Sequence, residues 1–271
     1  MFEFSLRQVA LCGQQPGEEP GELAEPPSDL PAVIGTIGDQ FRDPFTRLCL
    51  YLARTYGDAP QTRTDDTVVI GTEYGNTAAL VRLQRRAEAE GKMLSAKHFP
   101  NATSSSASAF VNLSIGATGR NLTLNAGLLT PVMAIWQALF ALAVDRSSTS
   151  KVLIGDVYSP EALLDARREP NDLQCRSGLT HATFVKGREF RADIALTSDH
   201  DEASVLGGQI GSSRSSDRNG AFVTAEFLDL IQTLDVGQQA VLTCRGTLAR
   251  RGVLTVTRQN IDTARNGGCG E

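Results

Sequence analysis

The feature that most restricts the fold is a nearly unbroken apolar run from Leu128 to Val144, LLTPVMAIWQALFALAV. It falls short of the ~20 residues that span a bilayer, and Thr130, Pro131 and Gln137 interrupt it. Pro131 suits the first turn of a helix, where its missing N–H costs no hydrogen bond. We therefore expect a helix that is buried on nearly all sides in a large core, and not a membrane span.

Short β-branched runs alternate with helical patterns on both sides of this segment. Thr67–Gly71 (TVVIG) and Lys151–Asp156 (KVLIGD) have the composition of strands that are buried on both faces. The other predicted strands are 6–12, 121–125, 183–186, 190–196, 240–245 and 253–258, and the predicted helices are 44–56, 76–90, 131–144, 222–234 and the second half of 100–114. This alternation predicts an α/β sandwich with strands covered on both faces.

The size and the loops of the chain indicate one domain. A chain of 271 residues can bury ~70–75% of its unfolded surface, so it needs no metal or disulfide for stability. Neither a repeat nor a change in charge marks a boundary, and we expect a single domain over 1–271. Residues 13–30 predict an acidic Pro/Gly loop, 199–218 a polar Gly/Ser-rich loop, and 260–271 a frayed tail.

Charge and cysteine usage exclude several classes of function. The net charge of −5 argues against non-specific binding of nucleic acid or an anionic membrane, which both need a basic field. The five cysteines are scattered and never form a Cys-x-x-Cys pair, so we expect reduced thiols, no zinc site and no cofactor. Residues 1–12 lack the basic and apolar regions of a signal peptide, which favours a cytoplasmic location.

An ordered set of motifs spans residues 67–161. It contains the strand and turn VVIGTEYG, the segment FPNATSSSASAFVNLSIGATGRNLTLNAGLLTPVMAIWQAL and the strand KVLIGDVYSPE. Its order and spacing resemble the β-ketoacyl synthase family, which has the thiolase fold. The matching positions are Gly71, Thr72, Gly75, Phe99, Pro100, Asn101, Gly119, Asn121, Leu122 and Thr123. The resemblance implies a layered α/β sandwich with a complete N-terminal half and a shortened C-terminal half.

The sequence departs from this family at the nucleophile. The catalytic cysteine of the family falls at Leu128, and no cysteine occurs between Cys49 and Cys175. A leucine side chain cannot carry an acyl thioester. We therefore expect no catalytic residue at this turn.

The histidines depart from the family pattern as well. Its members use two histidines well after the cysteine to orient the thioester and stabilise an enolate. Here His98 precedes the turn, and His181 and His200 follow it too closely. The resemblance thus implies a catalytically silent subunit, like the chain-length factors of aryl-polyene and related polyketide or fatty-acid-type pathways, which pair with an active ketosynthase.

The resemblance also implies a set of interface and acyl-channel residues. The strand before the nucleophile turn would pair with the same strand of the ketosynthase, Tyr74 would gate the acyl pocket, and His98 and Phe99 would reach across the interface. Bulky rings there would set the length of the acyl chain by excluded volume. An acyl carrier protein is the further partner expected. The strand residues are Asn121, Leu122, Thr123, Leu124 and Asn125.

Other functions stay open. An acyl-transferring or thioester-hydrolysing enzyme could use another nucleophile, such as Thr130 or a serine in 104–106. A free-standing homodimeric binding protein is a third possibility. The turn after Gly71 lacks the Gly-Lys-Ser/Thr ending of a phosphate-binding loop, and residues 199–202 (DHDE) favour a solvated loop over a metal site.

Overall fold

The computed structural model describes residues 1–21, 26–57, 64–90, 96–144, 147–168, 173–198, 209–213, 217–246 and 250–260. Its strands are β1 (Phe2–Gly13), β2 (Thr67–Gly71), β3 (Asn121–Leu124), β4 (Thr149–Asp156), β5 (Gly178–Ser198), β6 (Gln209–Ser213), β7 (Gln239–Arg245) and β8 (Arg250–Arg258). Its helices are α1 (Leu30–Ile34), α2 (Pro44–Thr55), α3 (Thr77–Glu90), α4 (Ser106–Ile115), α5 (Thr130–Val144), α6 (Pro160–Ala166) and α7 (Gly220–Gln232), with short 3-10 turns at Asp39–Phe41 and Ala96–Asn101.

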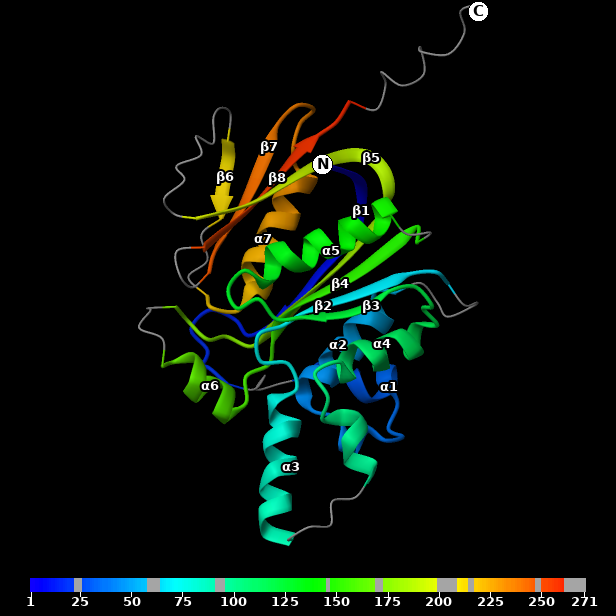
Figure 1. The fold of residues 1–271 in the computed structure, drawn as a ribbon, viewed down its shortest axis with the longest axis vertical. Helices are drawn as coiled ribbons and strands as arrows, with labels where there is room; N and C mark the ends of the chain where they lie inside the picture. Colours follow the sequence, from blue (N-terminus) through cyan, green and yellow to red (C-terminus); the bar gives the residue numbers. More distant parts are fainter. Residues whose placement is uncertain are drawn as a thin grey trace, which may run out of the picture.

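One mixed sheet organises the molecule (Figure 1). Its order is β3-β2-β4-β5-β8-β7-β6, and β1 pairs with β5. The first half of β5 is antiparallel to both β4 and β1, whereas residues 190–198 of β5 pair with β8. The strand β5 therefore carries the chain from the first part of the sheet into the second.

The helices form layers on this sheet. α5 and α7 touch each other and contact strands of both parts of the sheet, while α2 and α4 pack together on the opposite face of β2 and β4 (Figure 1). Asp43 begins α2 by accepting a hydrogen bond of 2.6 Å from the N–H of Thr46, and Pro44 follows at the first turn. The α/β sandwich predicted from the sequence is confirmed.

The apolar segment is the central helix α5. Residues 127–144 are long and apolar enough to cross a membrane by length and composition alone. In the fold, Val132, Ile135 and Leu139 are at most 1% exposed and belong to the main core cluster. Gly71 lets β2 approach this helix, because a Cβ there would lie 2.8 Å from that of Ala134. α5 is thus a core helix, as the sequence predicts.

The second half of the chain differs from the prediction in two places. The predicted strands 183–186 and 190–196 are parts of one bent strand, β5. Its pairing with β1 shifts register between Val185 and Phe190, so residues 187–189 form an irregularity at the bend, and β8 pairs with β5 from Phe190 onward. The strand β6 lies inside the predicted loop 199–218 and pairs with β7 in parallel. The short helices α1 and α6 were not predicted, since five and seven residues carry too little periodicity. The predicted tail lies almost wholly outside the described residues.

The acidic loop after β1 is held by polar contacts. Gln14 is 3% exposed, donates to the carbonyl of Glu19 and accepts from the N–H of Ser177, both at 2.8 Å. The hydroxyl of Ser177 also donates to the carbonyl of Gly21. The loop is therefore attached to the start of β5 by hydrogen bonds. Its composition offers few apolar side chains that could pack there instead.

A buried histidine makes stability depend on pH. His181 on β5 is fully buried, its ring stacks on Tyr56 at 6.0 Å between centroids, and neither ring nitrogen has a hydrogen-bond partner among the described residues. Burial, and secondly the charge of Lys151, lower the pKa of His181 from 6.5 to about 4. The ammonium of Lys151 is itself paired with the carboxylate of Asp66 at 3.5 Å.

We expect His181 to lower the free energy of unfolding by about 2 kcal/mol between pH 7 and pH 5. The folded state binds the imidazole proton more weakly than the unfolded chain does. The contribution of the neutral imidazole to the free energy of unfolding is therefore complete above pH 6.5. It is lost as the pH falls from 6.5 toward 4. Urea unfolding of the wild type and of His181→Phe at both pH values measures it. Asp43 and Asp156 titrate in both proteins, so an equal pH slope in the two would refute the assignment.

Candidate functional site

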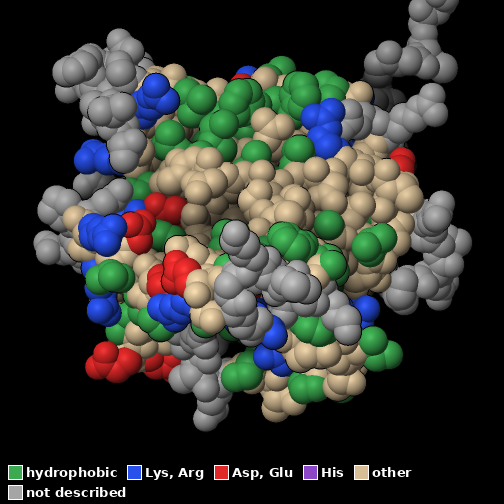
Figure 2. Space-filling view, turned by 60° about the horizontal axis from the view of Figure 1, so that its bottom comes forward, with side chains coloured by type: hydrophobic (Ala, Val, Ile, Leu, Met, Phe, Trp, Pro, Cys, Tyr) green, Lys and Arg blue, Asp and Glu red, His purple; other side chains and the backbone are tan. Residues whose placement is uncertain are grey.

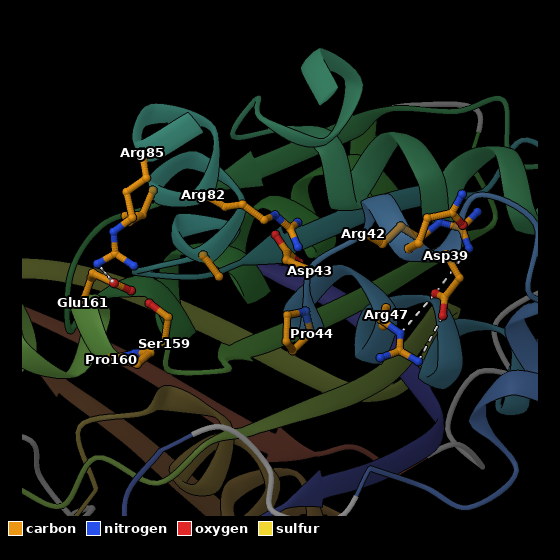
Figure 3. A pocket seen from close by; sticks show the side chains of 13 residues that line it. Asp39, Arg42, Asp43, Pro44, Arg47, Arg82, Arg85, Ser159, Pro160 and Glu161 are labelled. Carbon is orange, nitrogen blue, oxygen red and sulfur yellow. Dashed lines mark hydrogen bonds and ion pairs between the residues drawn. The ribbon is translucent and has the colours of Figure 1, made fainter. Parts of the chain in front are cut away.

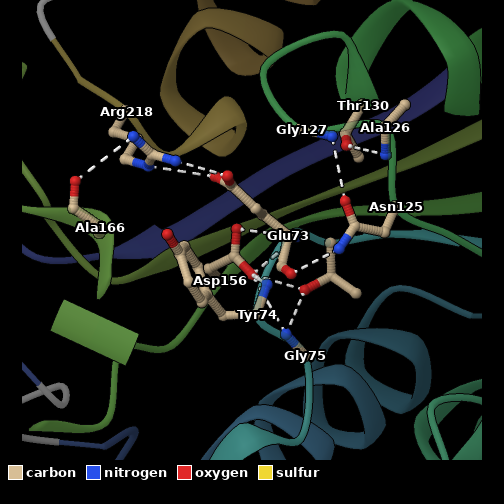
Figure 4. A network of polar contacts seen from close by, with 11 residues as sticks. Glu73, Tyr74, Gly75, Asn125, Ala126, Gly127, Thr130, Asp156, Ala166 and Arg218 are labelled. Carbon is tan, nitrogen blue, oxygen red and sulfur yellow. Dashed lines mark hydrogen bonds and ion pairs between the residues drawn. The ribbon is translucent and has the colours of Figure 1, made fainter. Parts of the chain in front are cut away.

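A buried carboxylate shapes the turn that follows β2. Asp156 ends β4 and is 3% exposed. It accepts hydrogen bonds from the hydroxyl of Thr72 at 2.5 Å and from the N–H groups of Glu73, Tyr74 and Gly75 at 3.0, 2.7 and 3.3 Å (Figure 4). Burial raises the pKa of Asp156, and these hydrogen bonds oppose the shift. The carboxylate therefore fixes the turn in one conformation.

A buried ion pair connects this turn to the start of α7. Arg218 has a side chain only 3% exposed, and its guanidinium binds both carboxylate oxygens of Glu73 at 2.5 and 3.2 Å. Asn125, directly after β3, donates to the backbone carbonyl of Glu73 at 2.7 Å. The ion pair and the hydrogen bond from Asn125 together link three segments that are distant in the sequence (Figure 4).

The chain makes a tight turn between the end of β3 and the start of α5. Gly127 has φ +56°, in the left-handed region, and its N–H donates to the side chain of Asn125 at 3.0 Å. The hydroxyl of Thr130 accepts from the N–H of Ala126 at 3.0 Å. Leu128 is thus presented at the N-terminus of α5.

The space around Leu128 is nearly filled. The cavity there measures only about 10 Å³, which is at the lower limit for a single water molecule. Among the described residues, neither a cysteine nor a histidine lines it. The lining residues are Gly71, Glu73, Gly127, Leu128, Thr130, Pro131, Ile154, Gly155, Asp156, Arg218 and Gly220. In the conformation described, this cavity has no room for a substrate, and the residues that line it include neither a thiol nor an imidazole.

The candidate gating residue Tyr74 lies within a small apolar cluster. Its ring is 5.5 Å from that of Tyr158, which is fully buried, and the guanidinium of Arg218 lies 5.9 Å from its centroid. Burial is the main cause of a raised pKa for Tyr74, so its hydroxyl is neutral at physiological pH. The buried members of the cluster are Tyr158, Ala162, Ala166 and Cys175.

The candidate interface strand β3 lies at one edge of the sheet. The carbonyls of Arg120 and Leu124 accept hydrogen bonds from β2 and the residue after it. Alternate residues of a strand point their N–H and C=O groups to opposite sides, so Asn121 and Thr123 direct theirs away from β2. Phe99 is 52% exposed, and the side chain of His98 lies outside the described residues.

A half-exposed stripe of α5 flanks this edge. Met133, Trp136 and Phe140 recur at helical spacing among the residues of α5 that are not buried, and Val144 extends the series. Phe140 is 37% and Val144 55% exposed. The guanidinium of Arg120, the residue before β3, lies 5.7 Å from the centroid of the Phe140 ring. An open strand edge and exposed apolar side chains are therefore neighbours.

An arginine-lined cleft of about 620 Å³ lies between α3, α6 and the start of α2 (Figure 3). Arg85 bridges α3 to Glu161 of α6 at 2.6 Å, and Arg47 binds Asp39 at 3.0 Å. Arg82 points toward Asp43 in the same cleft (Figure 3). Basic and acidic side chains also lie next to one another on the lower face of the molecule (Figure 2).

Some of the site residues predicted from the sequence lie close together in the structure, and further residues join them. Asn125 and the turn of Tyr74 meet through Glu73, and Leu128 lies beside them. Sequence reasoning missed Glu73, Asp156 and Arg218. The position of Asp156, at the carboxyl end of a buried strand neighbouring the Gly-Thr turn, is a signal that could have been used. Residues 199–202 lie outside the described part, and the described residues contain no cluster of three metal-ligating side chains.

Comparison with known proteins gives no match by sequence: neither a protein-family model nor a curated protein matches the chain. Solved structures do match. A structure titled as the ishigamide ketosynthase/chain length factor has a TM-score of 0.70 at 13% identity, covering 87% of this chain and 86% of that chain. A ketosynthase (ApeO) in complex with its chain length factor (ApeC) from Xenorhabdus doucetiae gives 0.59 at 10% identity, covering 95% and 100%.

A third structure, a ketosynthase from module 6 of the bacillaene synthase of Bacillus subtilis, gives a TM-score of 0.60 at 9% identity and covers 87% of this chain but 62% of that chain. At such low identity, the likeness concerns architecture. This chain therefore has the thiolase-like α/β fold that ketosynthases and chain length factors share.

Proposed function

We propose that this protein is a non-catalytic, chain-length-factor-type subunit that pairs with an active ketosynthase and shapes its acyl channel. The observation that carries the proposal is the filled cavity at Leu128, which offers neither thiol nor imidazole among the described residues. A condensing enzyme needs a nucleophile and space for an acyl chain there. The fold without this chemistry suits a partner subunit.

The edge strand β3 supports pairing with a second protein. Unpaired N–H and C=O groups on a strand edge are a template for another strand. The apolar stripe of α5, which ends at Phe140 and Val144, extends the same surface. Apolar area next to an open strand edge is typical of an interface that is buried in the functional assembly.

The second expected partner is an acyl carrier protein, for which we propose the arginine-lined cleft as docking surface. Arg82, Arg85 and Arg47 present guanidinium groups there, while the acidic partners Asp39 and Glu161 are the less exposed members of their pairs. The pairs preorganise the arginines, which can bind further carboxylates or phosphates. We also propose that residues 1–271 act as one domain, since β5 belongs to both parts of the sheet. A cytoplasmic location is part of the same proposal.

Arg82→Glu is expected to weaken binding of the carrier protein about tenfold, because it reverses one charge of the cleft. Titration of labelled carrier protein at low and moderate salt measures the effect, which should shrink as salt rises. Arg188→Glu on β5, where the side chain is 72% exposed, is the matched control. Equal loss in both variants would show that the cleft has no special role.

The acyl-channel roles of Tyr74, His98 and Phe99 are part of the proposal. Tyr74→Ala is expected to lengthen the products of the ketosynthase pair, because it removes a ring that limits the channel by excluded volume. Tyr74→Phe keeps the ring and should leave product length unchanged. Mass spectrometry of the products of the reconstituted pair measures their chain length. Identical chain lengths for the wild type and Tyr74→Ala would refute this assignment.

Co-expression with a ketosynthase encoded nearby tests the proposed function itself. Size-exclusion chromatography should show a stable heteromeric complex, and only the complex should convert malonyl-loaded carrier protein into a ketoester. Conversion by the isolated chain would overturn the proposal. A stable self-dimer that gains nothing from a ketosynthase would instead favour a homodimeric binding protein.

An enzyme with another nucleophile is the competing function. Thr130 is 4% exposed and its hydroxyl is engaged by the N–H of Ala126, and Ser106 is 1% exposed with its hydroxyl bound to Thr103. These contacts disfavour both as nucleophiles. Incubation with an acyl thioester followed by intact mass measurement separates the two functions, because a covalent adduct would favour the enzyme.

A further inference from the structure

One face of the second part of the sheet is turned away from the helices α5 and α7, which pack on β7 and β8 (Figure 1). Successive side chains of a strand point to opposite faces. Ala192, Cys244 and Leu254 belong to the main core cluster, so the residues with odd numbers in 191–197, 239–245 and 251–257 point away from the core. The exposed residues on this outer face are Arg191, Asp193, Ala195 and Arg245.

Three neighbouring strands bring polar side chains together at one end of the outer face. Arg251 of β8 lies directly opposite Arg245 of β7 on one side and Thr197 of β5 on the other. Residues that are paired in this way point to the same face, with their Cβ atoms about 5 Å apart. Two guanidinium groups and a hydroxyl therefore form a row across the sheet. Arg250, the residue before Arg251, belongs to the opposite face.

The positive charge of this row is not balanced by the described residues. Neither Arg245 nor Arg251 forms an ion pair with any of them, and the Nε of Arg251 has no hydrogen-bond partner there. The one carboxylate among the paired positions of β5, β7 and β8 on the outer face is Asp193, which binds Arg191 at 3.4 Å. Like charges directly opposite each other destabilise a sheet. An anion between the two guanidinium groups would remove this repulsion.

We propose that the row of Thr197, Arg251 and Arg245 binds a dianionic phosphate group, supplied by inorganic phosphate or by a small phosphate monoester. A phosphate monoester has three terminal oxygens and nearly two negative charges, which match one hydroxyl and two guanidinium groups. Arginine binds phosphate through paired N–H donors, and such charge-assisted hydrogen bonds are stronger than neutral ones. The site goes beyond the proposed function, because it belongs neither to the edge strand β3 nor to the arginine-lined cleft.

Calorimetric titration of the full chain with inorganic phosphate, glucose 6-phosphate and acetate tests the site. A slightly alkaline buffer of constant ionic strength keeps both phosphates dianionic and the screening equal. Both phosphates should bind, and acetate, with one charge and two oxygens, should bind about tenfold more weakly. Tighter binding of glucose 6-phosphate would assign the site to a phosphate ester, and tighter binding of inorganic phosphate to the free ion. No binding of either phosphate, or equal binding of acetate, would overturn the proposal.

Substitutions on the two faces of β8 locate the binding. Arg251→Gln and Arg245→Gln each remove one guanidinium group of the row and should lower the affinity for phosphate about tenfold. Arg250→Gln is the matched control, because it removes the same charge one residue away on the opposite face, and its affinity should stay within about twofold of the wild type. Thr197→Val removes only the hydroxyl and should lower the affinity about threefold. Equal losses in Arg251→Gln and Arg250→Gln would overturn the site.

Thermal unfolding gives a second measurement, which also excludes loss of fold as the cause of lost binding. Without phosphate, Arg245→Gln should unfold at the temperature of the wild type or above it, because one of two facing like charges is gone. Phosphate should raise the unfolding temperature of the wild type and of Arg250→Gln, but not that of Arg245→Gln. A lower unfolding temperature of Arg245→Gln without phosphate would contradict the repulsion from which the site is inferred. Both measurements use the chain without a ketosynthase, so their result is independent of the proposed pairing.

Discussion

Replacing Phe140 with aspartate is expected to abolish pairing with a ketosynthase while the fold remains intact. The ring is 37% exposed on α5 and is not a member of the core clusters of the described residues, so we expect the isolated subunit to keep its fold. In the complex, however, the carboxylate would be buried beside β3, and its desolvation costs free energy even though the guanidinium of Arg120 lies 5.7 Å from the Phe140 ring centroid. Burial of such a charge in an interface costs about 3 kcal/mol, which raises a dissociation constant more than a hundredfold.

The control for this experiment is Leu164→Asp, which adds the same charge at an exposed leucine of α6. Co-purification and size-exclusion chromatography compare the two variants, and circular dichroism with thermal unfolding checks the fold. A second variant, Asn121→Pro, removes an outward N–H at the start of the edge strand but no bond to β2. It should also weaken pairing. If Phe140→Asp paired as tightly as the control, β3 and α5 would not form the interface.

Removing the guanidinium of Arg218 is expected to lower the free energy of unfolding by about 3 kcal/mol. The Arg218→Met variant keeps an apolar stem but removes the ion pair of Glu73, whose side chain is only 18% exposed. Glu73 also holds Asn125 through its backbone carbonyl at 2.7 Å. We therefore expect the loss to spread to the turn before α5, with faster amide hydrogen exchange at Gly127 in particular.

A double-mutant cycle separates the charge pair from simple loss of packing. Glu73→Gln combined with Arg218→Met removes both charges, and the double variant should be more stable than the sum of the single losses predicts. Denaturant unfolding of the four proteins gives the coupling energy. Additive losses would mean that Glu73 and Arg218 act independently. Arg188→Met, at a side chain 72% exposed, should change stability by less than about 0.5 kcal/mol.

Regular elements with strong local patterns were predictable. The apolar segment that ends at Val144 is a helix, and the β-branched runs at Thr67–Gly71 and Lys151–Asp156 are buried strands. Each of these patterns arises within a few consecutive residues, where side-chain period and branching decide the backbone. Their order also predicted the layered α/β class, which the solved structures confirm.

Elements whose conformation depends on distant partners were not predictable. The strand β6 forms because β7 lies beside it, and its own sequence is that of a polar loop. The bent strand β5 is continuous because β1, β4 and β8 pair with its successive parts. The backbone hydrogen bonds that define these strands are satisfied between segments far apart in the chain, and no local pattern records them.

By itself, the sequence determined what the turn before α5 lacks: a leucine at position 128 has no group that could attack a thioester. The tertiary structure alone decided what occupies that space instead. Glu73, Asp156 and Arg218 come from three separate segments and meet only after β2, β4 and α7 have packed. The physical reason is that side-chain chemistry is a property of each residue, whereas the satisfaction of buried charges depends on which segments the fold brings within hydrogen-bond distance.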